Sequence, residues 1–543
     1  MNRSLSLVRA IILGMLVFGS STHTRAEEQV DAGWPGMFGD WGAGKQMLVR
    51  SIDLNLSQVP TRTAPAPRRN YDGFLIGPHF SIVDAPFSQV LLLNQAVKEP
   101  NGALARELVR YLHDSGSNAL RLYDGYWWNP LGPSTTLPIL AHFGHIAASR
   151  IRELVEGSPY TDARPIFDYL SGNGFDVVMV VSTIYYDPDT HQVYSTQQVA
   201  DDVDGVLAKS AERNADTLAR WWKEHGHNRR LVLEIGNEGI GYSKDPKPTL
   251  EQYSRIVVSF ARAIKQANPD VEVAAVVTHG FRGVIESCQE VAPLIDHVIT
   301  HLYDQHRRDW GLSYPRDVTT HLNALSKDLD AHGYEHTKIL ITEYNFDLWS
   351  RQRDTVGHAV ANTARQIAIA SHPRVSGMFI HNTPGTSLFS YSDGTRWSLV
   401  PPGLVTHLGE YKGHLPDTRG EQLGRRLRML PTGYCQRLLS EACRGELVDA
   451  YAMDDFGQIA FLMTREGDHV RILLSNLQPT SLQAHIPYLR EATVAVFSGE
   501  SWHVRPSDEL EQPYGISRRS VPKVLSVVAP PFSVLLVAGL RTG

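Results

Sequence analysis

Two glutamates that follow apolar runs are the residues on which chemistry could depend. Residues 231–241 read LVLEIGNEGIG, with Glu238 just after the run, and residues 338–345 read KILITEYN, with Glu343 near its end. An unpaired carboxylate in an apolar interior is costly, so such a residue is either paired or faces a cavity. Cleavage of a glycosidic bond needs one carboxylic acid to protonate the leaving oxygen and one carboxylate to attack or to guide water. Glu238 and Glu343 suit this chemistry if the fold brings them together.

A regular alternation of apolar runs and amphipathic segments would position these glutamates. Between the runs lie helical patterns, and in residues 249–270 the apolar side chains recur at a period of 3.6 residues. The eight expected strands are 73–77, 119–123, 176–181, 230–236, 271–277, 297–303, 338–344 and 377–382.

This alternation predicts a (β/α)8 TIM barrel over residues 70–414. Strands that read as nearly continuous hydrophobic runs are typical of a parallel sheet covered by helices, and eight such units can close on themselves. A doubly wound open sheet is the alternative. It is disfavoured because no glycine-rich phosphate-binding loop follows the first strand.

Polar and aromatic side chains gather at the ends of these strands. In a TIM barrel the active site lies at the C-terminal ends of the strands, where loops from all eight units meet. The candidate substrate-binding residues there are His79, Arg121, Tyr126, Trp127, Asn237, His301, Tyr303 and Asn345.

The strand-end motifs resemble clan A of the glycoside hydrolases. The resemblance depends on Asn237-Glu238 after the fourth strand, His301-x-Tyr303 at the end of the sixth, Glu343 at the end of the seventh and Arg121 on the second. LEIGNE and ITEYN are most similar to the families that hold α-L-arabinofuranosidases, β-xylosidases and β-glucuronidases. The likeness covers the barrel and, in architecture only, the C-terminal segment. It implies a retaining glycoside hydrolase.

The resemblance also implies a role for each matched residue. Glu238 would be the general acid/base, and Glu343 the nucleophile that forms a glycosyl-enzyme intermediate. Asn237 would hydrogen-bond the sugar 2-hydroxyl, Tyr303 would donate to the nucleophile, and Arg121 would keep Glu343 ionised. His301 is expected either to bind a sugar hydroxyl or to satisfy a backbone group.

The sequence leaves the substrate and two other functions open. Arabinofuranosidases usually carry a Glu after the first strand and an Arg-aromatic-Pro-Gly-Gly run after the second, where this chain has GPHFS and RLYDGY. An endo-acting glycanase on a bacterial or plant polysaccharide is one alternative, and a non-catalytic carbohydrate-binding barrel is another. The two glutamates could also be structural members of ion pairs.

Glu234 and an aromatic group have further expected positions. Glu234 lies deeper in its strand than Glu238, so we expect a salt bridge inside the barrel rather than a catalytic role. The aromatic rings could stack on pyranose faces or simply pack at the rim. If the segment is extended, adjacent Trp127 and Trp128 cannot both point into one cleft. This group comprises Tyr123, Tyr126, Trp127, Trp128, Tyr185 and Tyr186.

Composition and the first residues restrict the class of protein. The chain has 543 residues, 42% hydrophobic and 20% charged, with a net charge of −6 and no long Lys/Arg run. This composition predicts no nucleic-acid partner. The resemblance to clan A implies a carbohydrate substrate, and we expect no cofactor or metal. Residues 1–26 have the pattern of a secretory signal peptide, which predicts a secreted or periplasmic protein without stable membrane insertion; an uncleaved anchor is the alternative. Residues 27–69 read as an N-terminal extension and linker that could add a strand to the C-terminal domain.

The last part of the chain follows a different pattern. From residue 415 to 543, short strand-like segments are separated by turn signals, which predicts an all-β sandwich domain whose default role is packing against the barrel. In an oxidising compartment Cys435 and Cys443 would form a disulfide and Cys288 would stay a buried thiol. The alternative is that all three cysteines are free and buried.

Overall fold

The computed structural model describes the chain from residue 50 to residue 541, with gaps. The described residues are 50–53, 70–80, 97, 99–122, 164–187, 189–239, 246–278, 280–303, 315–345, 355–381, 389–392, 397–398, 426–452, 459–499 and 514–541. The predicted signal peptide, most of the predicted linker, and Tyr123 to Trp128 lie outside these ranges.

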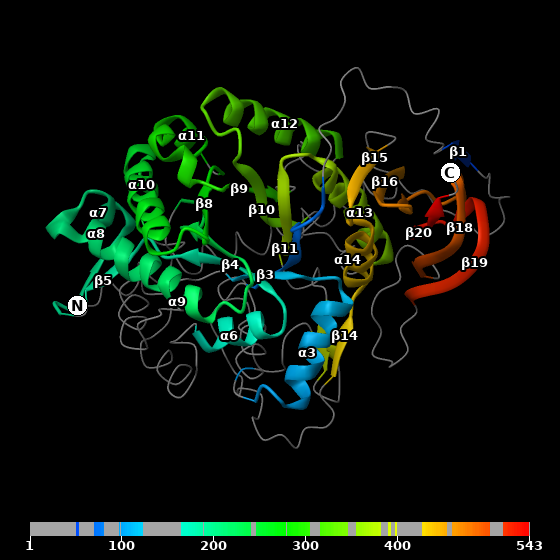
Figure 1. Cartoon of the computed structure of the whole chain (residues 1–543), viewed down its shortest axis with the longest axis horizontal. Coiled ribbons are helices and arrows are strands. Elements are labelled where there is room, and N and C mark those ends of the chain that lie inside the picture. The colour runs from blue at the N-terminus through cyan, green and yellow to red at the C-terminus, as the bar shows by residue number, and fades with distance from the viewer. Residues whose placement is uncertain are drawn as a thin grey trace, which may run out of the picture.

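Eight parallel strands close into a barrel, in the order β10-β11-β2-β3-β4-β7-β8-β9 (Figure 1). All eight predicted strands are therefore confirmed, and the alternative of an open doubly wound sheet is wrong. Their bounds are β2 Leu75–Phe80, β3 Ala119–Leu122, β4 Asp176–Val181, β7 Leu231–Ile235, β8 Glu272–Val276, β9 His297–Tyr303, β10 Lys338–Asn345 and β11 Val375–His381.

Helices cover the outside of the barrel. In α10, the predicted apolar face is buried, and Thr249 and Gln252 form a capping box at its start. The apolar residues that recur every 3.6 positions thus form the face of the helix that packs against the sheet. The helices of the barrel are α3 Ala103–Asp114, α6 Arg164–Gly172, α7 Thr196–Ala200, α8 Val206–Ala211, α9 Thr217–His225, α10 Leu250–Ala267, α11 Val284–Ser287, α12 Pro315–Ala331 and α13 Val356–Ser371.

Short elements connect these units. The segment between β4 and β7 also contains a 3₁₀ turn (Val203–Gly205) and a π-helical turn (Glu212–Asp216), and Gln289–Leu294 forms a 3₁₀ turn before β9. Two small sheets complete the connections: β5 Tyr185–Asp187 with β6 Gln192–Tyr194, and β12 Phe389–Ser392 with β13 Trp397–Ser398 and β14 Arg426–Met429.

A charged network ties the N-terminal ends of several strands together. Arg230, just before β7, donates from Nε and Nη2 to Glu272 of β8 at 2.7 and 2.9 Å. Nε2 of His297, on β9, lies 2.5 Å from Glu272, and its Nδ1 lies 3.0 Å from the hydroxyl of Ser376 on β11. Burial alone would raise the pKa of Glu272, but the hydrogen bonds from His297 and Arg230 hold it well below its usual range.

We expect Glu272→Gln to destabilise the fold in a pH-dependent way. Because the folded-state pKa of Glu272 is lowered, the carboxylate contributes stability above its ordinary pKa of 4.5 and loses it as the pH falls below that value. The network is partly exposed, so its contribution should lie between those of exposed and buried ion pairs. We therefore expect the free energy of unfolding at pH 7 to fall by about 2 kcal/mol. Urea unfolding of wild type and variant from pH 7 to pH 3 measures it. If the difference in free energy of unfolding between wild type and variant stays constant with pH, the stabilisation does not come from the charge of Glu272.

The C-terminal strands form a separate sheet beside the barrel, confirming the predicted β-sandwich domain (Figure 1). The sheet order is β1-β18-β20-β17-β16-β15, with β19 paired to β18, and β1 pairs with β18 in parallel. The bounds are β1 Arg50–Asp53, β15 Glu446–Ala452, β16 Ile459–Glu466, β17 His469–Asn476, β18 Leu482–Gly499, β19 Tyr514–Ala529 and β20 Ser533–Arg541.

Alternate residues of this sheet belong to two cores. Leu462 and Leu473 pack into the core shared with the barrel helices, whereas Phe461 and Leu474 belong to a second core within the domain. Successive side chains of a strand point to opposite faces of the sheet. One face therefore packs on α13 and its neighbours, and the other encloses the domain's own core.

A helix that the sequence pattern did not predict lies beyond residue 414. Helix α14, Pro431–Ala442, contacts α13, and its Gln436 and Ser440 donate to the carbonyls of Ser115 and Gly116 after α3. It thus fills the place between the first and last barrel helices (Figure 1). Cys435, Leu438, Leu439 and Ala442 are buried in this helix at a helical spacing, within the region 415–543 that the sequence pattern predicts to be all-β.

The predicted disulfide between Cys435 and Cys443 is wrong. Cys435 is in α14 and Cys443 caps its end, so the two cysteines are eight positions apart along the helix, about 12 Å along its axis. Bridged cysteines have Cα atoms less than about 7 Å apart. All three cysteines, including Cys288, are free and buried, as in the alternative reading.

Among the described residues, no helix has the length and apolar character needed to cross a membrane.

Candidate active site

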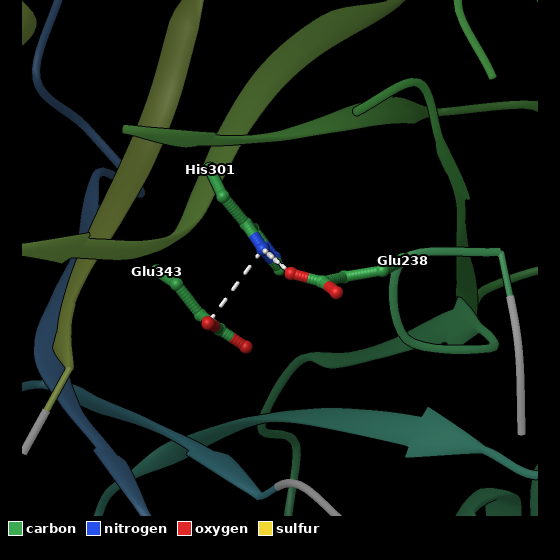
Figure 2. Close-up of side chains that lie close together, drawn as sticks. All are labelled: Glu238, His301 and Glu343. Carbon is green, nitrogen blue, oxygen red and sulfur yellow. Dashed lines mark hydrogen bonds and ion pairs between the residues drawn. The ribbon is translucent and has the colours of Figure 1, made fainter. Parts of the chain in front are cut away.

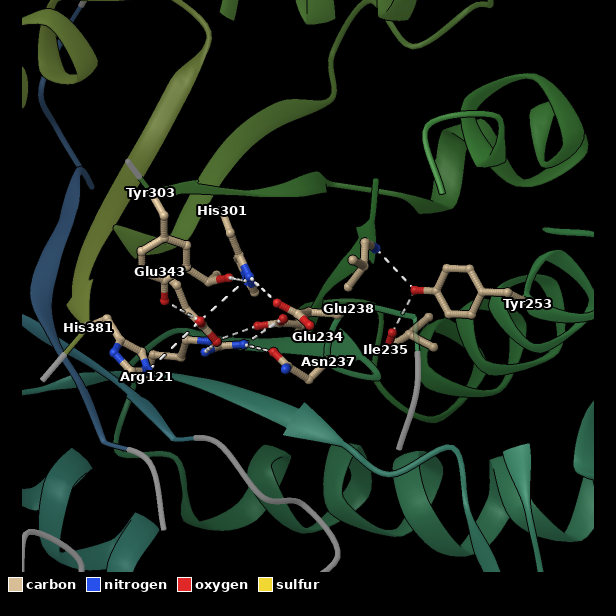
Figure 3. A network of polar contacts seen from close by, with 12 residues as sticks. Arg121, Glu234, Ile235, Asn237, Glu238, Tyr253, His301, Tyr303, Glu343 and His381 are labelled. Carbon is tan, nitrogen blue, oxygen red and sulfur yellow. Dashed lines mark hydrogen bonds and ion pairs between the residues drawn. The ribbon is translucent and has the colours of Figure 1, made fainter. Parts of the chain in front are cut away.

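Strands from around the barrel bring the strand-end residues together at one rim. Figure 3 shows Glu343 from β10, Glu238 from the turn after β7, Arg121 from β3 and Tyr303 from β9 pointing toward a common centre. The parallel sheet places these C-terminal strand ends side by side, because β9 pairs with β10 and β4 lies between β3 and β7. Residues distant in the sequence therefore meet as predicted.

Glu343 is held between two donors. Arg121 Nη1 donates to Oε1 at 2.7 Å, and the hydroxyl of Tyr303 donates to Oε2 at 2.5 Å. Only 8% of the Glu343 side chain is exposed. Both oxygens accept hydrogen bonds, so the carboxyl group has a fixed orientation and the environment of a carboxylate.

Arg121 is the centre of a buried polar network. Its Nε and Nη2 donate to the two oxygens of Glu234 at 2.8 and 2.7 Å, and Nη2 also donates to Asn237 Oδ1 at 2.8 Å. Burial alone would lower the pKa of Arg121, but Glu234 and Glu343 raise it above its usual value. The guanidinium is fully buried and stays charged between two carboxylates.

The turn that carries Glu238 has an unusual backbone. Gly236, Glu238 and Gly239 have φ of +69°, +52° and +79°, the left-handed region that favours glycine. The hydroxyl of Tyr253 donates to the carbonyl of Ile235 at 2.7 Å, which fixes the end of β7 (Figure 3). The turn lifts Glu238 out of the strand, so its side chain is 34% exposed whereas Glu234 is fully buried.

His301 lies between the two glutamates (Figure 2). Its Nδ1 is 3.4 Å from Glu238 Oε1 and 3.6 Å from Glu343 Oε2, and its Nε2 is 3.2 Å from the hydroxyl of Thr342. The ring thus contacts both carboxyl groups.

The carboxyl groups of Glu238 and Glu343 lie close together. Ligand-type atoms of these two residues and His301 are all within 4.8 Å of one another. Such a set could in principle hold a metal ion. However, Glu343 already accepts from the Arg121 guanidinium, and a cation beside that positive charge would be repelled. The donor set suits proton transfer and nucleophilic attack better than metal binding.

Four other predicted substrate-binding residues are only partly described by the structure or not at all. Tyr126 and Trp127 lie outside the described residues. His79 is the next-to-last residue of β2, and Asn345 is the last residue of β10. The backbone of His79 pairs with Arg121 on one side and His381 on the other.

Two of the aromatic residues proposed for stacking are instead part of the core. Tyr185 and Tyr186 are 2% and 7% exposed, and the ring of Tyr185 stacks on Tyr194. The hydroxyl of Tyr186 is bonded to His191. These two rings pack, and they present no face to a sugar.

Sequence reasoning left three members of the network without a role. His381 Nε2 lies 4.0 Å from Glu343 Oε2, and its ring meets the Tyr303 ring edge to face. Its position at the end of the eighth strand was the available signal. Thr342 and Tyr253 had no comparable signal, because one is an ordinary strand residue and the other lies on a helix face.

We expect Gly239→Ala to impair the site more than the fold. Gly239 has φ of +79°, and an added Cβ would lie 2.2 Å from the ring of Phe281. The turn must shift and carry Glu238 with it, so any activity that depends on Glu238 should fall at least about tenfold. Gly174→Ala is the matched control, since its φ is +87° and nothing lies within 4 Å of the added atom. Equal activity in the two variants would contradict a need for this turn geometry.

No family model matches the sequence, and no curated protein matches it either. The structure, by contrast, is similar to several solved enzymes. A glucosidase from Croceicoccus marinus has 12% identity and a TM-score of 0.54, covering 91% of this chain and 100% of its own. An α-L-arabinofuranosidase from Thermotoga maritima has 12% identity and a TM-score of 0.56, covering 90% and 99%.

A family 51 α-L-arabinofuranosidase from Bifidobacterium longum gives the same picture, with 13% identity, a TM-score of 0.55 and coverage of 88% and 97%. α-L-Arabinofuranosidases are thus among the structural neighbours, which agrees with the predicted resemblance to clan A. At these identities the likeness establishes the fold: a TIM barrel with a β-sandwich.

Proposed function

We propose that the protein is a retaining glycoside hydrolase that acts by double displacement, with Glu343 as nucleophile and Glu238 as general acid/base. The observation that carries this proposal is the approach of two carboxyl groups at the C-terminal rim of the barrel, within 4.8 Å of each other at their nearest atoms. Their environments differ in the way that two distinct roles require. Glu343 is buried under two donors, whereas Glu238 is partly exposed.

In the first step a Glu343 oxygen attacks the anomeric carbon of the sugar. A bond between that carbon and the carboxylate oxygen forms as the glycosidic C–O bond breaks, and Glu238 gives its proton to the leaving oxygen. The aglycone departs as an alcohol. Tyr303 and Arg121 fix the direction of attack because each holds one oxygen of Glu343.

In the second step water replaces the aglycone. Glu238, now a carboxylate, takes a proton from the water as its oxygen bonds to the anomeric carbon, and the ester bond to Glu343 breaks. The free sugar leaves with its original anomeric configuration, and both glutamates return to their starting protonation states.

The distance between the carboxyl groups supports retention over inversion. Retaining enzymes hold these groups about 5 to 5.5 Å apart, whereas inverting enzymes leave about 6.5 to 9.5 Å for a water molecule. The nearest oxygens of Glu238 and Glu343 lie within 4.8 Å of each other, which is closer to the retaining separation than to the inverting one.

The proposed substrate is a polysaccharide or one of its fragments. The neighbours named as arabinofuranosidases and a glucosidase make arabinofuranosides and glucosides the first sugars to test, followed by xylosides and glucuronides. The signal-like residues 1–26 would place the enzyme outside the cytoplasm, where such polymers occur.

A panel of 4-nitrophenyl glycosides of these four sugars, together with arabinan, xylan and β-glucan, tests the proposal. We expect release of 4-nitrophenol or reducing sugar from at least one member, and its loss in Glu343→Ala. Carbohydrate binding by calorimetry without hydrolysis of any bound member would instead favour a non-catalytic barrel.

A further inference from the structure

One buried carboxylate in the network has no part in the two chemical steps. Glu234 lies on β7 with its side chain fully buried, and both of its oxygens accept hydrogen bonds from Arg121 (Figure 3). Burying a carboxylate is costly even when it is paired, so a purely structural position could be filled more cheaply by an apolar side chain. Arg121 links Glu234 directly to the proposed nucleophile Glu343.

We propose that Glu234 is a positioning residue that shares the charge of Arg121 with Glu343 and thereby sets the reactivity of the nucleophile. This inference rests on the proposed glycosidase function. Glu234 engages Nε and Nη2 of the guanidinium, which leaves Nη1 directed at Glu343. The same two bonds fix the plane of the guanidinium, and so the orientation of the carboxylate that attacks.

Charge sharing matters because Glu343 changes its charge during the cycle. Before attack, one guanidinium lies between two carboxylates, so neither receives its full stabilisation. After attack, Glu343 is a neutral ester, and Glu234 still balances the buried Arg121. Without Glu234, the full charge of Arg121 would act on Glu343 before attack. In the intermediate, Arg121 would then have neither Glu234 nor an ionised Glu343 to balance its charge.

Removing the charge of Glu234 should therefore affect the two steps unequally. In the first step a carboxylate held more tightly by Arg121 is a weaker nucleophile, and the positive transition state also loses a nearby negative charge, so the two effects add. In the second step the carboxylate is the leaving group, which Arg121 stabilises, so the two effects oppose each other.

The charged groups around Glu234 determine how the kcat/KM profile against pH should respond when Glu234 is replaced. Arg121 on β3, Glu343 on β10 and His301 on β9 act on it, and burial raises the pKa of Glu234 against the opposing effect of Arg121. The bonds to both oxygens are nevertheless those of an ionised carboxylate. The acidic limb of kcat/KM should follow Glu343, and it should move to lower pH when Glu234 loses its charge.

The test compares Glu234→Gln with Glu272→Gln. Both variants replace a carboxylate that accepts hydrogen bonds from Nε and Nη2 of an arginine, but Glu272 lies at the opposite, N-terminal end of the barrel. The probe is the 2,4-dinitrophenyl glycoside of whichever panel sugar the wild type hydrolyses, followed by stopped flow. The burst gives the first step and the steady state gives the second.

For Glu234→Gln we expect the first step to slow at least tenfold and the second step to change less, so the burst should shrink. The acidic limb of the kcat/KM profile should move to lower pH. Glu272→Gln should leave the ratio of the two steps and the acidic limb unchanged. Glu234→Asp keeps the charge and should keep the wild-type acidic limb, even if its rate falls. Equal slowing of both steps with an unmoved acidic limb would overturn the inference and make Glu234 merely structural.

A second arm needs no sugar substrate and separates this inference from the proposed function. If Glu234 and Glu343 share Arg121, the urea midpoint of the Glu234→Gln/Glu343→Gln double variant should fall by more than the two single shifts together, because the buried guanidinium then loses both carboxylates. Additive shifts would refute charge sharing whether or not any glycoside is hydrolysed. A larger-than-additive fall without hydrolysis of any glycoside would leave charge sharing standing, but it would remove both the glycosidase proposal and the catalytic role of Glu234.

Discussion

Glu343→Ala is expected to lower hydrolysis of every substrate by about 10⁴-fold or more, because it removes the atom that forms the covalent bond. Poor and good leaving groups should suffer alike, since neither can react without a nucleophile. Steady-state kinetics on 4-nitrophenyl and 2,4-dinitrophenyl glycosides measure the loss. Glu335→Ala, at an exposed position just before β10, is the control and should retain full activity.

Azide distinguishes a lost nucleophile from a damaged fold. In Glu343→Ala a small anion can occupy the vacated side of the site and attack the anomeric carbon of an activated substrate. The product would be a glycosyl azide of inverted configuration. Failure of azide to restore turnover, together with a large drop in melting temperature, would mean that Glu343 serves the stability of the Arg121 network instead.

Glu238→Ala is expected to show a different dependence on the leaving group. A 2,4-dinitrophenolate leaves without a proton, so kcat/KM for that substrate should stay within about tenfold of wild type, whereas substrates with alkyl leaving groups should lose about 10²- to 10⁴-fold. The second step also lacks its base, so the glycosyl-enzyme should accumulate. Azide should then release it as a glycosyl azide of retained configuration.

Opposite stereochemistry from the two alanine variants is an outcome that no shared structural role can produce. Glu238 and Glu343 are the same residue type and lie within 4.8 Å of each other at their nearest oxygens. Equal losses on all leaving groups, without an azide response in either variant, would contradict the assignment of separate roles.

The barrel could be predicted because its strands are buried on both faces. A run such as 176–181, DVVMVV, is wholly buried in β4, and such a run reads as a strand without help from its neighbours. The placement of Glu238 and Glu343 followed from the same logic, since polar residues at the ends of buried strands must face a cavity or a partner. Glu234 was expected to form a salt bridge within the barrel, and it pairs with Arg121.

Other features depend on spatial relations that the sequence pattern does not contain. That Arg121 would serve Glu234, Glu343 and Asn237 at once depends on the stagger of neighbouring strands, not on their spacing in the chain. Tyr185 follows β4 but turns into a small sheet with β6, so its ring is buried.

The error about the two cysteines had a different cause. Cys435 and Cys443 are near each other in the sequence, but a helix holds them apart. The helical spacing of its apolar residues is a short signal within a region dominated by strand-like segments. A proximity argument holds only when the local structure is known.

The most direct test of the account is to identify the residue that becomes covalently attached to the sugar. A 2-deoxy-2-fluoro glycosyl fluoride of the sugar found with the panel forms the intermediate quickly and releases it slowly, so the labelled peptide can be sequenced by mass spectrometry. The account predicts one sugar per chain, attached to Glu343. A label on any other residue, or hydrolysis that yields an inverted sugar without a label, would contradict it.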